Sequence, residues 1–178
     1  KSANPTPSPP TSSMQALKNI KYYYFDVYAR GELPRMILGY NKIDFEDIRP
    51  NKESWPELKP KTKFGQLPVI EIDGKQIAQA FVIAKYICSK TGQYPSDVEE
   101  QVAVDEWVEL VKLDCSENFN KFWSIKDDQR KAYLDNFFEN GLITKLELFE
   151  KQLKSGKGEY LVGDSITLAD FALLEFAQ

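Results

Sequence analysis

One stretch decides the fold of the first part of this chain, and it reads Pro68-Val69-Ile70-Glu71-Ile72-Asp73-Gly74-Lys75-Gln76-Ile77. Two strand-forming runs flank the dipeptide Asp73-Gly74. Both residues of such a dipeptide accept the positive φ angles that a two-residue hairpin turn requires. The stretch therefore predicts an antiparallel β-hairpin.

The segments on either side of this hairpin predict the rest of a small α/β unit. Residues 21–27 form an aromatic and β-branched run that is typical of a buried strand, and residues 32–40 predict a short helix. Residues 43–48 alternate apolar and acidic side chains, as a strand with one solvated face does. Residues 79–90 predict a second helix. The order β-α-β, loop, β-β-α indicates a mixed sheet with helices packed on it.

The chain after residue 94 has helical periodicity, with apolar residues at three- and four-residue steps. These residues are Val104, Trp107, Val108, Val111, Cys115, Phe119 and Phe122, and then Ile143, Leu146, Phe149 and Leu153. Thr167-Leu168-Ala169-Asp170 has the pattern of a capping box, which predicts the start of a last helix. A composition break at residues 91–95 separates this helical part from the α/β unit. The fold class is therefore α/β followed by all-α.

The ends of the chain suggest three parts in all. The first 13 residues hold four of the ten prolines and no large apolar side chain, so we expect an extended Pro/Ser/Thr-rich tail over residues 1–20. An α/β domain over 21–94 and a helical domain over 95–178, incomplete at its C-terminal end, would follow. The chain begins with Lys, which fits removal of a leader and fits other trimming equally well. We expect a secreted, extracellular protein, with a cytoplasmic one as the alternative.

Composition and charge exclude several classes of function. The chain has 178 residues, of which 42% are apolar and 28% charged, so it is not a disordered polymer. A net charge of -4 offers no broad basic surface, and we expect no nucleic-acid partner. No apolar run approaches the roughly 20 residues of a membrane-spanning helix, so we expect no membrane insertion.

The sequence has no histidine and two cysteines, and these two counts exclude most catalytic chemistry. It rules out a Ser-His-Asp triad, a histidine general base and a zinc site of Cys/His type. Cys88 and Cys115 lie far apart in predicted helices, and we expect two buried thiols rather than a redox pair or a disulfide. Tyrosine, lysine, arginine and the carboxylates remain as candidate catalytic groups.

Several spaced motifs agree in order with one known family. They are Tyr24-Phe25-Asp26-Val27, Arg30-Gly31-Glu32 with Arg35, Trp55-Pro56-Glu57-Leu58-Lys59, Phe64-Gly65-Gln66-Leu67-Pro68, Asp73-Gly74-Lys75, Gln79 with Ile83-Ala84-Lys85-Tyr86, and Gly163-Asp164-Ser165-Ile166-Thr167-Leu168-Ala169-Asp170-Phe171. Over residues 21–178 the chain resembles the cytosolic-type glutathione transferases, and within them the sigma class that includes glutathione-dependent prostaglandin D synthases. The resemblance implies the glutathione transferase fold, a thioredoxin-like N-terminal domain followed by an all-helical C-terminal domain, and a homodimer.

The resemblance also implies which residues activate glutathione, the co-substrate of this family. Bringing a thiol pKa from about 8.5 to 6 or 7 requires roughly 2 to 3 kcal/mol. A hydrogen bond to a charged group contributes about 1.5 to 3 kcal/mol, so one or two donors are enough. Tyr24 stands where the family places a hydroxyl donor to the sulfur, and Arg30 where it places a cation beside it. Pattern alone does not distinguish Tyr24 from Tyr22 and Tyr23, and Arg30 could be an ordinary surface residue.

Further glutathione-binding residues follow from the same resemblance. Trp55 and Lys59 match the pair that holds the glycine carboxylate, although Trp55 could merely pin its loop. Gln66 can add an amide contact. The Leu67–Pro68 bond is cis in the family and exposes the backbone of Leu67 to the cysteinyl portion. The remaining glutathione-binding candidates are Gln79 and Ala80.

Three departures from the family pattern change the expectations. Ala80 replaces a serine that binds the γ-glutamyl carboxylate, so we expect weakened but retained glutathione binding. Tyr28-Ala29 replaces Arg-Gly in the expected pocket for the second substrate. Some relatives have an acidic cluster for a divalent cation, and Glu109, Lys112 and Leu113 stand at the corresponding positions of this chain. A lysine there opposes a cation directly, so we expect no metal. The expected second-substrate pocket consists of Phe25, Val27, Tyr28 and Ala29.

The leading hypothesis is an enzyme, a glutathione S-transferase that directs the glutathione thiolate at a hydrophobic electrophile, as in detoxification. Isomerisation of prostaglandin H2 to prostaglandin D2 is the sharper activity that the class resemblance raises. The alternative is a non-catalytic crystallin-like or ligand-carrying relative. Thiol-disulfide exchange is a third and weaker hypothesis, because the first helix begins without a cysteine.

Overall fold

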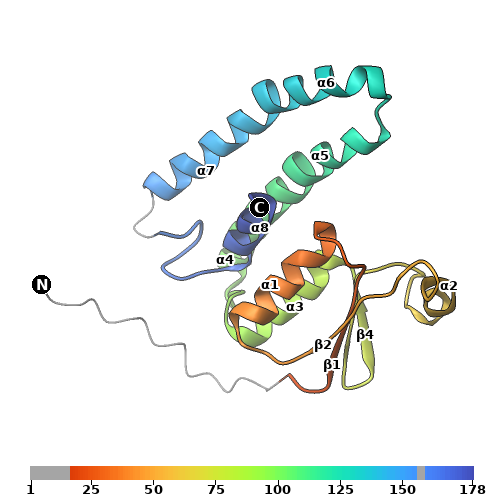
Figure 1. Ribbon diagram of the computed structural model, residues 1–178. Coiled ribbons are helices and arrows are strands. Elements are labelled where there is room, and N and C mark those ends of the chain that lie inside the picture. The colour runs from red at the N-terminus through yellow and green to blue at the C-terminus, as the bar shows by residue number, and fades with distance from the viewer. Residues whose placement is uncertain (1–16, 156–158) are drawn as a thin grey trace, which may run out of the picture.

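The sheet of the N-terminal part has four strands in the computed structural model, which describes residues 17–155 and 159–178 (Figure 1). Most of the expected tail lies outside the described residues. The strands are β1 (Ile20–Tyr23), β2 (Glu46–Ile48), β3 (Val69–Ile72) and β4 (Lys75–Ala78), in the order β2-β1-β3-β4. Strand β1 pairs parallel with β2 and antiparallel with β3, and β3 pairs antiparallel with β4. The sheet is mixed, as predicted.

The hairpin between β3 and β4 forms as predicted. Ile72 pairs with Lys75, so the loop consists of two residues. Their φ angles are 49° at Asp73 and 79° at Gly74, both in the left-handed region that this turn needs. Val69 and Ile70 of β3 are fully buried, so the centre of the sheet is shielded from solvent.

Two strands are shorter than predicted. The predicted strand over 21–27 ends at Tyr23, because the chain turns away from the sheet beyond Tyr24, whose N–H donates to the Ile48 carbonyl at 3.1 Å. The predicted strand over 43–48 contracts to Glu46–Ile48, the three residues that pair with β1. A side-chain pattern indicates strand propensity, whereas the paired partner decides how far a strand extends.

Helices cover the sheet and connect its strands. A 3-10 turn, η1 (Ala29–Gly31), leads into α1 (Glu32–Tyr40), which has the predicted bounds. The loop between β2 and β3 contains α2 (Trp55–Leu58) and η2 (Lys59–Lys61). Helix α3 (Ala80–Thr91) has Gln79 as its N-cap and ends at Gly92, whose φ of 79° is the left-handed conformation typical of a helix end. Figure 1 shows α1 and α3 side by side against the sheet.

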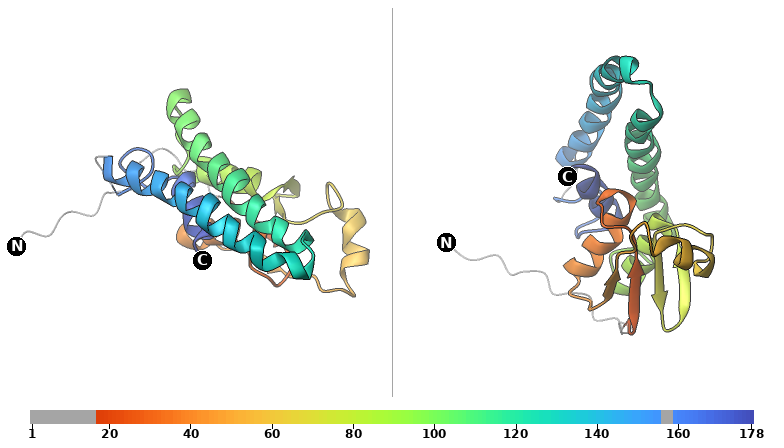
Figure 2. Two further views of the ribbon diagram at one scale, coloured as in Figure 1. Left: turned by 90° about the horizontal axis from the view of Figure 1, so that it is seen from above. Right: turned by 45° about the vertical axis from the view of Figure 1, so that its right-hand side comes forward.

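The remainder of the described chain is helical. Its elements are α4 (Val98–Glu109), the π-helical η3 (Leu110–Glu117), α5 (Asn118–Asn120), η4 (Lys121–Ser124), α6 (Asp127–Asn136), the π-helical η5 (Phe137–Leu142), α7 (Ile143–Ser155) and α8 (Leu168–Phe176). Two long arms, from α4 to η4 and from α6 to α7, form a hairpin that projects away from the sheet (Figure 2). Helix α8 packs against α1, α3 and α4. Within the described residues, no helix has both the length and the apolar character of a membrane span.

The two parts share one hydrophobic core across a tightly bonded junction. In the predicted linker, the Gln93 side chain exchanges two hydrogen bonds with Asn41, at 2.8 and 2.9 Å, and the backbone carbonyl of Gln93 accepts from the Leu168 N–H at 2.9 Å. The Tyr94 hydroxyl donates to Asp105 at 2.9 Å. The composition break therefore marks a change of architecture in a segment that is itself held in place.

Two local predictions about the helices are confirmed. The capping box over Thr167–Asp170 forms at the start of α8, where the Asp170 carboxylate accepts from the Thr167 N–H at 2.8 Å. Cys88 and Cys115 are both buried and unpaired with each other. Burial raises the pKa of the Cys115 thiol to about 11, so this thiol is un-ionised at neutral pH.

Candidate functional site

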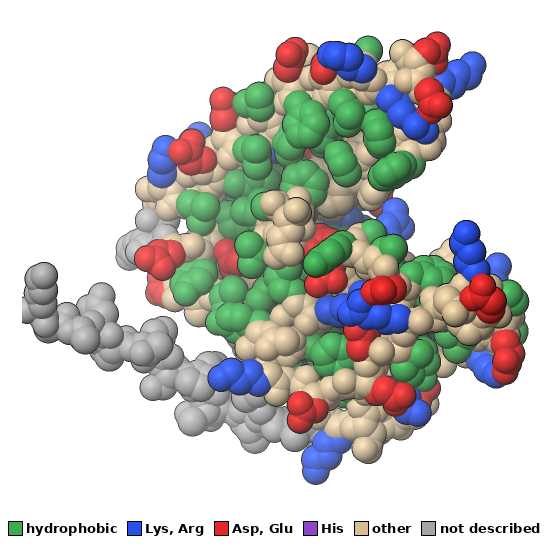
Figure 3. Space-filling view, viewed as in Figure 1, with side chains coloured by type: hydrophobic (Ala, Val, Ile, Leu, Met, Phe, Trp, Pro, Cys, Tyr) green, Lys and Arg blue, Asp and Glu red, His purple; other side chains and the backbone are tan. Residues whose placement is uncertain are grey.

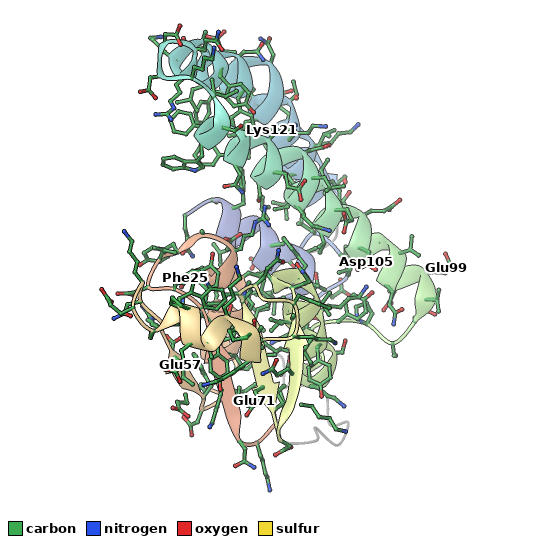
Figure 4. The ribbon with its side chains drawn as sticks, turned by 90° about the vertical axis from the view of Figure 1, so that its right-hand side faces the viewer. Phe25, Glu57, Glu71, Glu99, Asp105 and Lys121 are labelled. Atoms are coloured by element: carbon green, nitrogen blue, oxygen red, sulfur yellow. The ribbon has the colours of Figure 1, made fainter. Side chains whose placement is uncertain are left out.

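The register of the sheet brings predicted site residues from three separate segments to one edge. Tyr23 pairs with Val69, and Val69 pairs with Ala78. The residues one step beyond these pairs are Tyr24, Pro68 and Gln79, and all three leave the sheet at the same end. Figure 4 shows Phe25 at this end, facing the helical part, with Glu71 farther down the strands.

Tyr24 is held in a buried position by a close approach to Gly31. Its side chain is 8% exposed, and its ring lies on the backbone at Gly31. A Cβ atom placed on Gly31 would lie 2.0 Å from Cδ1 of Tyr24, so only glycine leaves room for the ring. The Tyr22 hydroxyl donates to the Gly31 carbonyl at 2.8 Å and anchors the same turn.

The electrostatic surroundings keep the Tyr24 hydroxyl protonated. Burial raises its pKa above the ordinary value of 10.0, while the positive charges of Arg30 and Arg35 act in the opposite direction. Arg30 is exposed on η1, close enough for its charge to be the strongest of the opposing effects. A hydroxyl with a raised pKa can donate a hydrogen bond to a thiolate without losing its own proton.

The remaining predicted glutathione residues lie around the Leu67–Pro68 peptide bond, which is cis. Trp55 packs edge-on against the Phe25 ring, with 5.5 Å between ring centroids, so the α2 loop contacts the segment that follows Tyr24. Gln66 is exposed beside Leu67. The Lys59 side chain lies beside Gly65, because a Cβ atom placed on Gly65 would be 3.7 Å from Cε of Lys59.

The γ-glutamyl end of the predicted site lies at the first turn of α3. Gln79 is exposed and has a φ of 75°, so its backbone turns sharply into the helix. Ala80 is buried at the first helical position. The unpaired N–H groups and the dipole of a helix N-terminus favour a carboxylate there. Glutathione binding without a serine hydroxyl stays a prediction.

The predicted second-substrate residues occupy an exposed bend. Tyr28 is 73% exposed, Val27 and Ala29 are also exposed, and Phe25 is half-buried. Ala29 has a φ of 48°. Figure 3 shows the surface indented between the α/β part and the helical part, with apolar side chains gathered on the helical side. Exposed aromatic side chains of that side include Phe119 and Trp123.

The acidic residues near the expected cation position have lysine partners. Lys112 Nζ lies 2.9 Å from the Glu109 carboxylate, and Lys145 Nζ lies 2.9 Å from Asp114. Among the described residues there is no group of three or more cysteine or acidic side chains that could hold a metal ion. The expectation that no metal is needed stays a prediction.

Two charged residues near Tyr24 were missed as site residues by sequence reasoning. Arg35 pairs with Glu32, three residues earlier on α1, at 3.8 Å, but it is also buried and donates to the Tyr24 carbonyl at 3.4 Å. Glu175 on α8 is largely buried, which raises its pKa to about 7, and Glu32 adds to the effect. The burial of Arg35 had a readable signal, because the apolar Leu38, three residues later, shares its face of α1, whereas its contact with Tyr24 had none.

Comparisons with known proteins agree with this architecture. The family model "Glutathione S-transferase, N-terminal domain" matches residues 20–89, and "Glutathione S-transferase, C-terminal domain" matches residues 113–178. The chain is 36% identical to the Caenorhabditis elegans protein "Probable glutathione S-transferase 7" over 159 residues, which are 87% of this chain and 77% of that protein.

Solved structures give a similar result. Prostaglandin synthase D of Nilaparvata lugens superposes with a TM-score of 0.80 and 28% identity, over 89% of this chain and 79% of the other. Na-GST-3 of Necator americanus, described as a monomeric glutathione S-transferase, superposes with a TM-score of 0.79 and 31% identity over the same shares.

Proposed function

The chain belongs to the glutathione S-transferase family, and from this premise we propose that Tyr24 and Arg30 ionise the thiol of bound glutathione for attack on a hydrophobic electrophile. The observation that carries the proposal is the position of Tyr24. This buried residue lies at the same sheet edge as the cis Leu67–Pro68 bond and the start of α3. A tripeptide bound along that edge would place its cysteine between these features.

The proposed mechanism requires Tyr24 to remain a donor while the thiol loses its proton. The raised pKa of the Tyr24 hydroxyl meets this requirement, and Arg30 adds a positive charge that stabilises the thiolate. One charged hydrogen bond contributes about 1.5 to 3 kcal/mol, which lowers a thiol pKa by roughly one to two units. The thiol proton passes to solvent, and the thiolate then forms a carbon–sulfur bond with the electrophile. With an aryl halide the carbon–halogen bond breaks and halide leaves.

In this proposal the remaining predicted residues hold the tripeptide. The backbone of Leu67, beside Pro68, pairs with the cysteinyl portion, and the N-terminus of α3 at Ala80, together with Gln79, holds the γ-glutamyl carboxylate. Trp55 and Lys59 hold the glycine carboxylate, with Gln66 beside them. Phe25, Val27, Tyr28 and Ala29 form the wall against which the electrophile binds.

The thiolate itself provides the test. Glutathione thiolate absorbs in the ultraviolet, so difference spectra of the complex across pH 5 to 9 would give the apparent pKa of the bound thiol. We expect a thiolate band near neutral pH and conjugation of a generic aryl halide. Binding of glutathione without such a band would favour the non-catalytic, ligand-carrying alternative.

We propose isomerisation of prostaglandin H2 to prostaglandin D2 as a second candidate activity, favoured by the similarity to prostaglandin synthase D of Nilaparvata lugens. The thiolate would attack one endoperoxide oxygen, forming a sulfur–oxygen bond as the oxygen–oxygen bond breaks, and the other oxygen would take up a proton. Loss of a proton from the adjacent carbon would then form the ketone and release glutathione unchanged. A glutathione-dependent assay with prostaglandin H2, beside the aryl halide, tests this candidate.

Assembly and location are also proposals. We propose a homodimer, because the family resemblance implies one, and sedimentation velocity would test it against a monomer such as the one described for Na-GST-3.

The Pro/Ser/Thr-rich composition of residues 1–20 supports an extracellular location. Detection of the protein in secreted material or in cell lysate would decide between the extracellular and the cytoplasmic alternative.

A further inference from the structure

Four charged side chains form a continuous chain around the segment that follows β1. Asp47 on β2 lies at its centre. One oxygen of this carboxylate accepts from Nε and Nη2 of Arg35, both at 3.1 Å. The other accepts from Nε of Arg49 at 2.8 Å and forms an ion pair with Nη2 of Arg49 at 2.7 Å. Arg49 also donates to the Asp26 carboxylate. We call Asp26, Arg49, Asp47 and Arg35 the charged chain.

The two arginines of the charged chain contact three consecutive residues, Tyr24 to Asp26. At one end, Nη2 of Arg35 donates to the carbonyls of Tyr24 and Phe25, at 3.4 and 3.5 Å. Its guanidinium also lies 5.7 Å from the centre of the Tyr24 ring. At the other end Arg49 binds the side chain of Asp26. The backbone from Tyr24 to Asp26 is thus held from two sides.

The contacts of the charged chain stop where the exposed bend begins. The hydroxyl of Tyr22 fixes Gly31, on the far side of this bend. Between these anchors, Val27 to Ala29 are exposed, and among the described side-chain hydrogen bonds and ion pairs none involves them. The segment therefore has two fixed ends, and the catalytic candidate Tyr24 lies at one of them.

Stability alone is a poor explanation for this arrangement. The pair of Arg49 and Asp26 is well exposed, and exposed ion pairs contribute little to folding free energy. Burying Arg35 has a desolvation cost that its carboxylate partners only offset. What the charged chain does provide is a defined backbone position for Tyr24, and a misplacement of about 1 Å in a catalytic group can reduce turnover about a hundredfold.

We propose that the charged chain is a positioning network that holds the Tyr24 hydroxyl where it meets the glutathione sulfur. The inference rests on the proposed role of Tyr24. It assigns to Arg35, Asp47, Arg49 and Asp26 an effect on thiol ionisation and turnover that exceeds any effect on glutathione affinity. The four residues act through Tyr24 and do not themselves touch glutathione.

The exposed end of the network permits a test that does not depend on the buried arginine. Arg49→Met removes the contact to the segment, Asp26→Asn removes the charge of its acceptor, and the full chain is used throughout. Arg130→Met is the matched control, because Arg130 on α6 also pairs with an aspartate, Asp127 at 2.7 Å, and lies over an aromatic ring. Three quantities are measured: the apparent pKa of bound glutathione, kcat for an aryl halide, and the Kd of glutathione.

We expect both network variants to raise the pKa of the bound thiol by about half a unit or more and to lower kcat at least about threefold. The Kd of glutathione should change less than twofold, and Arg49→Lys should restore part of the thiol pKa. Arg130→Met should match the unmodified protein in all three quantities.

Failure of the proposed function and failure of the positioning network give different results. If the unmodified protein shows neither a thiolate band nor conjugation, the proposed function fails. If the unmodified protein is active and Arg49→Met and Asp26→Asn behave like Arg130→Met, the positioning network is refuted while the proposed function stands. Equal losses of kcat and glutathione affinity, with an unchanged thiol pKa, would also refute it, because they would indicate general loosening of the site.

Discussion

At the residue scale, the site depends on a small number of close approaches. Tyr24 lies on Gly31, where no side chain fits, and its hydroxyl is buried enough for its pKa to be raised. Ala80 stands at the first turn of α3, where a hydroxyl would add one hydrogen bond to a bound carboxylate. The functional consequence of each position can be measured with a change of a single oxygen atom.

Removing the Tyr24 hydroxyl should affect turnover more than binding. Tyr24→Phe keeps the ring against Gly31 but deletes the donor, so we expect kcat to fall about tenfold or more, with the Kd of glutathione changed less than threefold. Tyr23→Phe, one residue earlier in β1, is the control and should leave both constants near their original values. Equal losses in kcat and affinity for Tyr24→Phe would mean that the tyrosine only helps to hold the ligand.

Adding a hydroxyl at position 80 should improve glutathione binding. The Ala80→Ser side chain can donate to the γ-glutamyl carboxylate, and this charge-assisted hydrogen bond should tighten the Kd about threefold to tenfold. Isothermal titration with glutathione measures the effect. Ala103→Ser on α4 provides a matched control, and an affinity for Ala80→Ser no better than for this control would contradict the account.

At the element scale, the Asp170 carboxylate holds the start of α8 in place. Asp170 accepts not only from Thr167 but also from the Leu161 N–H, at 2.8 Å, so one carboxylate closes the capping box and fixes the preceding loop. Leu161 and Phe171 are both almost fully buried. Because α8 packs against helices of both parts, its position influences the whole core.

Deleting the Asp170 carboxylate should therefore cost more than deleting an ordinary cap. We expect Asp170→Ala to reduce the free energy of unfolding by about 2 to 3 kcal/mol, since it leaves two buried N–H groups without their partner. Asp97→Ala removes the N-cap of α4, which accepts from Glu99 and Glu100 in an exposed position, and should cost about 1 kcal/mol. Urea denaturation of both variants measures the difference, and equal costs would contradict this reading of α8.

At the scale of the whole molecule, the contact between the two parts places like charges near each other. Glu175 of α8 faces Glu32 of α1 and lies near Tyr24, and burial with the neighbouring carboxylate raises its pKa to about 7. An acid whose pKa is higher in the folded than in the unfolded state binds more protons when folded. Stability linked to it is present below the unfolded value of 4.5 and is lost as the pH rises through about 7.

Replacing Glu175 with an uncharged isostere should change this pH dependence. Glu175→Gln should make the protein more stable than the original above pH 7, by about 1 to 2 kcal/mol after solvent screening, and flatten the decline between about pH 4.5 and 7. Thermal unfolding at half-unit intervals of pH measures both effects. Glu150→Gln on α7, which removes an exposed carboxylate paired with Lys154, is the control. Parallel stability curves for Glu175→Gln and the original protein would refute the prediction.

The sequence by itself determined the local elements of this protein. The Asp73-Gly74 turn, the bounds of α1, the capping box of α8 and the helical periodicity after residue 94 all depend on turn chemistry and on the period of the chain. Interactions of this kind join residues a few positions apart, so a single sequence contains them. The residues that carry the family resemblance could be named for the same reason, since they occur in short motifs.

Only the tertiary structure decided how these elements meet. The end of β1 at Tyr23 depends on three-residue pairing with β2, and the common edge of Tyr24, Pro68 and Gln79 depends on the register of three strands. The roles of Arg35 and Glu175 depend on what α1 and α8 pack against. Burial and charge of this kind are properties of pairs that are distant in sequence, and no local pattern records them.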